Sequence, residues 1–386
     1  MIRTPAPLSS SVRGVSFAVC WCSALVACGG GGGDPAAAPP ATSAPAPAPT
    51  PAPVPGPAPP PSDSMPAAGH PGGACAVPAA ARAVVTSAPD RVVGTGTPAS
   101  CSSDAVVAAV AAGGITTFDC GPDPVTITMT KTAKVFNDKP DVVLDGGGKV
   151  TLSGGGVLRI LYQNTCDPAQ VWTSARCDLQ DTPRTTVQNL TLVDGNGTAQ
   201  NYGDASVNGG GAIFVRGGQM KVVDSRFFRN RCEPNAADVG GGALRAFGPS
   251  APVYVVGSTF GGAAGQGGSC SNGGAISGLG ASFAVINSVI SHNSATGIGG
   301  GGGGAVYQDG NGFDLSVCGS SIHDNSANEG GGALFYVSND RSGTMSIVDS
   351  SLQANPSGRF ETEGLPGIFV LAAPGQPVVT RSTISK

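Results

Sequence analysis

The sequence predicts an all-β chain that folds as a single-stranded, right-handed parallel β-helix with a short N-terminal capping helix. Two motifs recur together in the C-terminal part of the chain with a period of about thirty residues, which is typical of a solenoid. Aliphatic residues hold equivalent positions in successive copies. Glycine is abundant, with 61 residues, while charged residues make up only 12%, about half the share found in ordinary soluble domains.

Residues 1–27 are typical of an export signal. Two early arginines precede an apolar run from Val15 to Ala27, which is too short to span a bilayer. The run ends Leu-Val-Ala-Cys at Cys28, which resembles the lipobox of bacterial lipoproteins. The resemblance implies cleavage before Cys28, acylation of Cys28 and a membrane anchor. In that family an Asp after the cysteine resembles a signal for retention in the inner membrane. Gly29 stands there instead, so the resemblance implies that the protein is anchored in the outer membrane, on its periplasmic or cell-surface side. A simple secretory signal cut nearby is the alternative.

Residues 28–74 are predicted to form a disordered tether. Five glycines follow Cys28, and a Pro/Ala-rich stretch continues to Ala68. Such a composition cannot bury a core and favours extended polyproline II. The tether would hold the folded part, residues 75–386, away from the membrane.

Eight cysteines follow Cys28, as expected for an oxidising compartment. The predicted disulfides are, in order of preference, Cys166–Cys177, Cys101–Cys120 and Cys232–Cys270. Cys318 falls in an aliphatic column and is predicted to be a buried free thiol, which leaves Cys75 without an assigned partner. No C-x-x-C spacing follows the signal peptide, so no metal site is predicted.

Residues 103–112 are predicted to form the capping helix, with Ser103 as N-cap and Gly113 as the C-terminal stop. The helix would cover the open edge of the first coil. From Ile115 onward the pattern indicates strands and turns only.

Two repeated motifs define the solenoid. Gly-Gly-Ala before an aliphatic residue occurs with Ala212, Ala243, Ala275, Ala305 and Ala333, and a second motif is centred on Ser225, Ser258, Ser288, Ser320, Ser350 and Ser382. Stacked copies place three aliphatic columns inside: the residue after each alanine, and the residues two before and two after each serine. Parallel crossovers are strongly biased to the right hand, which gives the expected handedness.

The paired motifs resemble the repeats of the chlamydial polymorphic outer-membrane proteins. Residues 210–213 match their G-G-A-I motif and residues 227–230 match F-x-x-N, and later copies replace Phe by an aliphatic residue. The resemblance spans about residues 187–386 and implies a passenger domain for adhesion. The fold also resembles the pectate-lyase-like superfamily, which includes polysaccharide lyases and hydrolases.

One candidate surface is a stripe of residues two positions after each repeat alanine. Strand alternation points this stripe outward, where aromatic rings can contact sugars or a cell-surface partner. Its predicted binding residues are Phe214, Arg245, Tyr307 and Phe335. A covering loop, or a register shifted by one residue, is the alternative.

A second candidate is the group Arg226, Arg229 and Arg231. A lyase that acts on acidic glycans needs cations to offset the substrate carboxylate, and only this alternative calls for a cofactor, calcium. A solvated charged loop is the competing interpretation. Hydrolases of this fold use grouped carboxylates, and the sequence contains no adjacent Asp pair that would indicate one.

The remaining features are interpreted structurally. The recurring Asn230, Asn293, Asn325 and Asn355 are expected to form an internal ladder, and His292 and His323 to be exposed turn residues. A net charge of -4 excludes nucleic acid as a partner. Self-association through the last coil is expected from its open strand edges. The favoured function is a non-catalytic cell-envelope scaffold for adhesion or polysaccharide binding.

Overall fold

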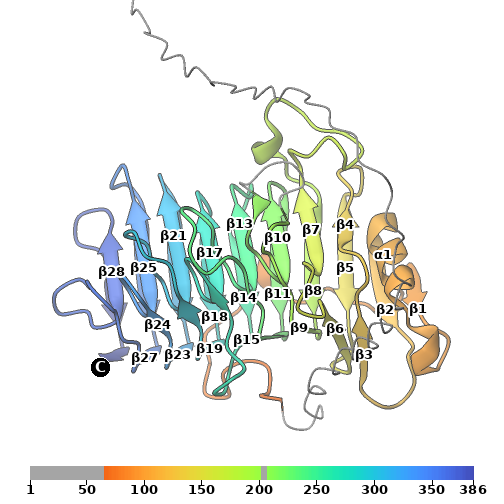
Figure 1. The fold of residues 1–386 in the computed structure, drawn as a ribbon, viewed down its shortest axis with the longest axis horizontal. Helices are drawn as coiled ribbons and strands as arrows, with labels where there is room; N and C mark the ends of the chain where they lie inside the picture. Colours follow the sequence, from red (N-terminus) through yellow and green to blue (C-terminus); the bar gives the residue numbers. More distant parts are fainter. Residues whose placement is uncertain (1–64, 201–206) are drawn as a thin grey trace, which may run out of the picture. The chain divides into compact units, whose positions relative to one another are not determined.

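The computed structural model describes residues 65–200 and 207–386, which form a parallel β-solenoid. Three long sheets make up its faces, and every strand pairs in parallel with the equivalent strand of the next coil (Figure 1). The predicted all-β fold is confirmed. The signal peptide, Cys28 and most of the predicted tether lie outside the described residues.

Sheet A of the described residues has ten strands, in the order β1 (Arg91–Val93), β2 (Gly114–Phe118), β5 (Asp141–Asp145), β8 (Arg184–Gln188), β11 (Gln219–Val223), β14 (Val253–Val256), β18 (Phe283–Ile286), β22 (Asp314–Cys318), β26 (Thr344–Val348) and β29 (Val378–Thr380). Sheet B there has nine: β3 (Val125–Thr128), β6 (Val150–Ser153), β9 (Thr191–Val193), β12 (Arg226–Phe228), β15 (Thr259–Phe260), β19 (Val289–Ser291), β23 (Ser321–His323), β27 (Ser351–Gln353) and β30 (Thr383–Ser385).

Sheet C of the same part of the chain has eight strands: β4 (Ala133–Val135), β7 (Leu161–Asn164), β10 (Ile213–Arg216), β13 (Leu244–Phe247), β17 (Ile276–Leu279), β21 (Val306–Gly310), β25 (Leu334–Ser338) and β28 (Ile368–Leu371). A short sheet D comprises β16 (Ser269–Cys270), β20 (Ser294–Ala295) and β24 (Ser326–Ala327). The helices are α1 (Ser103–Ala112) and the 3-10 turns η2 (Ala79–Ala81), η3 (Pro98–Ser100) and η4 (Cys177–Leu179). Within these described ranges, no helix combines the length and apolar character needed to cross a bilayer.

Helix α1 caps the first coil, as predicted, and lies at the end of the solenoid opposite β28 (Figure 1). Its Val106, Ala109 and Val110 are buried in the core. The predicted N-cap is wrong by one residue: Ser102 accepts the amide of Ala105 at 3.2 Å. The helix ends before Gly113, whose φ of 72° is left-handed and suits glycine.

Two of the three predicted core columns are confirmed. On sheet C, each residue after a repeat alanine pairs with its equivalent in the next coil, and all are fully buried: Ile213, Leu244, Ile276, Val306, Leu334 and Ile368. On sheet B, the residues two after each serine form the second column: Phe227, Phe260, Ile290, Ile322, Leu352 and the half-buried Ile384.

The third predicted column is wrong by one residue. On sheet A the inward positions are Val222, Val255, Val285, Val317 and Ile347. The residues two before each serine therefore point outward, because successive side chains of a strand alternate between faces. Val223, Val256 and Ile286 are buried nonetheless, because another segment of the chain covers them.

That covering segment is the N-terminal residues 65–86, which we call the strap. Ala81 is fully buried against the outward column. The hydroxyl of Thr259 donates to the carbonyl of Ala67 at 2.7 Å, and at the other end Thr86 donates to Asp145 at 2.7 Å. The folded part therefore begins before Cys75, and residues 65–74 of the predicted tether pack on the solenoid.

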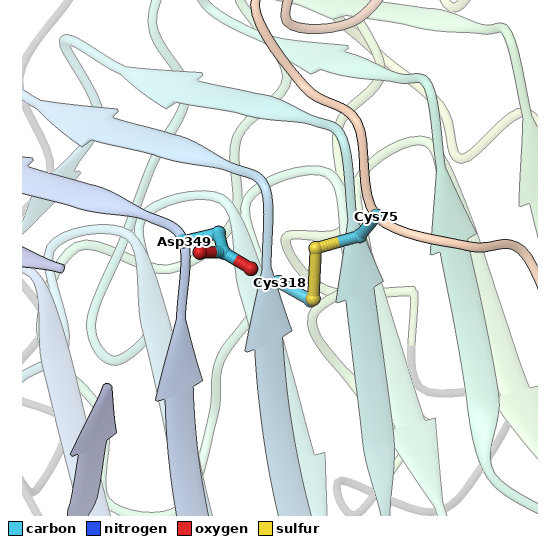
Figure 2. Close-up of side chains that lie close together, drawn as sticks. All are labelled: Cys75, Cys318 and Asp349. Carbon is cyan, nitrogen blue, oxygen red and sulfur yellow. A yellow bond between two sulfur atoms is a disulfide. The ribbon is translucent and has the colours of Figure 1, made fainter. Parts of the chain in front are cut away.

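Four disulfides join the eight cysteines of the described residues. The three predicted pairs are confirmed: Cys101–Cys120, Cys166–Cys177 and Cys232–Cys270. Cys318 is not a buried free thiol, because it points outward at the end of β22 and bonds to Cys75 in the strap. Figure 2 shows this disulfide, with Asp349 on the neighbouring coil beside it.

The Gly-Gly-Ala motif has a distinct structural reason for each glycine. The first glycine is left-handed, as in Gly273 with a φ of 58°. The second glycine lies where adjacent coils touch: a Cβ on Gly274 would overlap the carbonyl oxygen of Gly304 in the next coil. Only glycine meets both demands, which explains why the motif recurs once per coil.

Serine and asparagine side chains close the turns inside the wall. From Ser258 onward, each repeat serine hydroxyl accepts the amide of the equivalent serine in the preceding coil, as from Ser288 to Ser320 at 3.1 Å. Asn325 accepts the amide of Asn293 at 3.0 Å and donates to the carbonyl of Ile290 at 2.8 Å. The ladder interpretation of the asparagines is confirmed.

Replacing Asn325 by leucine is expected to lower the free energy of unfolding by about 3 kcal/mol, because buried backbone groups of Asn293 and Ile290 lose their partners. Urea unfolding followed by circular dichroism measures the change. The matched control is Asn311→Leu in an exposed turn, which should change stability by no more than about 0.5 kcal/mol. Equal losses in the two variants would contradict the ladder's role.

Candidate functional site

The outer face of sheet C carries one column of mostly large side chains, interrupted by Ser277. Strand pairing sets these positions in register: Lys134, Tyr162, Phe214, Arg245, Ser277, Tyr307, Phe335 and Phe369. The predicted stripe therefore exists and points out of the core. It also begins earlier than the repeat motifs indicate, since Tyr162 belongs to it.

The column is closed to solvent from Tyr162 to Arg245. Phe214 is fully buried and forms a cluster with Tyr162 and Val207. The guanidinium of Arg159 lies 4.9 Å from the ring centroid of Phe214. A covering segment therefore removes Phe214 from any ligand, which corrects its predicted exposure.

Arg245 is likewise buried, at 1% exposure. Its guanidinium donates to the backbone carbonyls of Asn208 and Asp238, each at 2.6 Å. Burial, and then the nearby cation of Arg159, lower the pKa of Arg245 to about 10. These bonds tie together the loops that cover the column, so Arg245 acts as a clamp for those loops.

The second half of the column forms the floor of a groove of about 450 Å³. Tyr307 and Phe335 stack with ring centroids 5.0 Å apart, and Phe335 and Phe369 follow at 5.1 Å. Two loops wall the groove, residues 236–238 and 297–301. The rings are stacked on each other, so they present edges to the groove, and Tyr307 and Phe335 are only 5% exposed.

The groove is polar and acidic above this apolar floor. Asp238 and Asp309 are the carboxylates among its described lining residues, and Ser271 and Asn272 add neutral polar groups. The Tyr307 hydroxyl donates to Asp309 at 3.2 Å. Burial raises the pKa of Tyr307, and the charge of Asp309 raises it further, so the hydroxyl remains a donor at neutral pH. Such a lining can bind hydroxyl groups and repels carboxylates.

The three arginines of the alternative site lie on or just after β12 of sheet B, not on sheet C. Arg229 binds Asp194 through two hydrogen bonds of 2.8 and 3.0 Å. Arg226 and Arg231 donate to backbone carbonyls of earlier coils, at 3.0 and 2.8 Å. Each guanidinium therefore already has oxygen partners within the chain.

A larger cleft of about 650 Å³ lies on sheet A beside the strap. Its charged side chains include the ion pair of Arg184 with Asp141, joined by two hydrogen bonds of 2.8 Å. Sequence reasoning missed this cleft, because the strap that borders it carries no motif.

The glycines at 299–301 were the signal for the sheet C groove, since a loop without side chains leaves room beside a sheet.

In comparison with known proteins, no protein family, curated protein or solved structure matches the chain. Fold and site together define a parallel β-solenoid with a loop-walled groove on one face.

Proposed function

We propose that this protein is an exported, lipid-anchored cell-envelope protein whose solenoid binds a neutral polysaccharide without cleaving it. The observation that carries the proposal is the groove on sheet C, with an apolar aromatic floor and hydroxyl-binding groups above it. Ligand sites commonly combine apolar walls with a few oriented polar groups.

The charge of the groove lining favours neutral over acidic glycans as the ligand. The acidic side chains among the described lining residues are Asp238 and Asp309, and two nitrogens of the buried Arg245 already donate to backbone carbonyls. A uronic acid carboxylate would meet like charge in this groove. The proposal therefore favours neutral sugars over the acidic substrate of the alternative lyase.

The cellular setting rests on the sequence of the N-terminal part. The lipobox-like ending at Cys28 supports an anchor in the outer membrane, and the disulfides support an oxidising compartment. Self-association through the last coil stays a prediction.

Replacing Asp309 by alanine is expected to weaken binding of a neutral polysaccharide at least tenfold, because a hydrogen bond to a charged group contributes about 1.5–3 kcal/mol. Affinity electrophoresis against neutral glycans and polyuronates measures the change. The control Asp104→Ala removes an exposed carboxylate of α1 and should retain full binding. Retention only on polyuronates, or release of unsaturated products from them, would favour the lyase instead.

A further inference from the structure

A second site candidate lies where strands β19 and β23 of sheet B end, away from the groove residues. Three groups of metal-ligating side chains occur among the described residues, and in two of them the sulfur atoms are in disulfides. The third group is His292, His323 and Asp324, whose ligand atoms all lie within 4.8 Å of one another.

The fold brings these residues together from adjacent coils. Strands β19 and β23 pair with Ser291 opposite His323, which places His292 beside Asp324 at the following corner. The amide of His292 donates to the carbonyl of His323 at 3.3 Å. Both His292 and Asp324 have left-handed backbones, with φ of 60° and 54°. The backbone of two coils therefore holds the group in place.

The distances suit a small divalent ion. Asp324 Oδ2 lies 2.8 Å from Nδ1 of His323 and 3.9 Å from Nε2 of His292. Metal–nitrogen distances of about 2.0–2.1 Å in a tetrahedral site place neighbouring ligand atoms about 3.4 Å apart. The two observed separations bracket that value, so small side-chain rotations would complete the site.

An outer contact also orients one ligand. Nδ1 of His292 lies 3.0 Å from the hydroxyl of Ser291. Metal-bound histidines commonly use their second ring nitrogen in this way, which directs the other nitrogen to the ion. The three side chains are only partly exposed, at 27%, 33% and 48%.

We propose that His292, His323 and Asp324 bind one divalent transition-metal ion, with Zn²⁺ and Cu²⁺ as the fitting chemistry. Two imidazoles and one carboxylate select these ions over Ca²⁺ and Mg²⁺, which require oxygen ligands. The ion cross-links two adjacent coils and keeps open positions for water or a further ligand. The proposal gives a role to the two histidines, which the sequence alone places as exposed turn residues.

The test is isothermal titration of the untagged mature protein with ZnCl₂. We expect one ion per chain with a micromolar Kd, and at least tenfold weaker binding in His292→Ala, His323→Ala and Asp324→Asn. The control His70→Ala removes the remaining histidine and should bind normally. Circular dichroism checks that each variant is folded.

A second measurement examines the ligands directly. Electron paramagnetic resonance of the Cu²⁺ complex should show coupling to two imidazole nitrogens, reduced to one in either histidine variant. Absence of binding at 100-fold excess over a micromolar Kd would overturn the proposal, as would equal affinity in His292→Ala and the parent protein.

Discussion

Removing the Cys75–Cys318 disulfide, by serine at both positions, is expected to lower the free energy of unfolding by about 5 kcal/mol. The bridge closes a loop with a sequence separation of 243 residues, and long loops gain the most from cross-linking in the chain-entropy model. The loss also frees the strap, which covers the outward column of sheet A at Val223, Val256 and Ile286. Exposure of that apolar column adds to the effect.

Urea unfolding gives the stability change, and trypsin reports on the strap. Arg82 lies in the strap and is exposed, and cleavage after it should be several-fold faster in the double variant. The matched control removes Cys166–Cys177, which closes a separation of only 11 residues. That control should lose about 3 kcal/mol without faster cleavage at Arg82. Unchanged cleavage in the Cys75 variant would show that packing alone holds the strap.

Replacing Gly274 by alanine is expected to lower the free energy of unfolding by about 3 kcal/mol. The new Cβ would overlap the carbonyl oxygen of Gly304 and the backbone nitrogen of Ser294. Backbone atoms cannot rotate aside, so the coils must separate locally, and overpacking of this kind costs about 1–3 kcal/mol.

The control for this variant is Gly280→Ala. Gly280 has a left-handed φ of 56°, and nothing lies within 4 Å of its Cβ position, so the variant tests backbone strain alone and should cost about 1 kcal/mol. Urea midpoints of the two variants give the comparison. If Gly280→Ala lowered the free energy of unfolding more than Gly274→Ala, backbone conformation rather than contact between coils would explain why glycine recurs in every coil.

The sequence predicts the solenoid because its repeats make the core columns visible, but it misplaces the inward face of sheet A. Both neighbouring positions on these strands are aliphatic, as in Val222 with Val223 and Val255 with Val256. Strands buried on both faces lose the alternation that marks the core side. The strap that buries the outer face is joined by a disulfide to a residue far away in sequence, which no local pattern reveals.

The same reasoning explains what was predictable at the groove. Alternation correctly places Tyr307 and Phe335 on the outer face of sheet C, but the column alone does not reveal that loops cover Phe214 and Arg245. Coverage depends on how loops of different coils fold over the sheet. The histidines were visible as residues, yet their proximity depends on the pairing of β19 with β23.

The strap also determines how the protein bears force. Any pull on the chain preceding residue 65 reaches Cys75 and passes through a covalent bond into β22, near the middle of the later coils. The load enters the solenoid from its side and spreads through neighbouring strands, so the coils are not peeled one by one from an end. A solenoid held in this way resists mechanical unravelling from its ends.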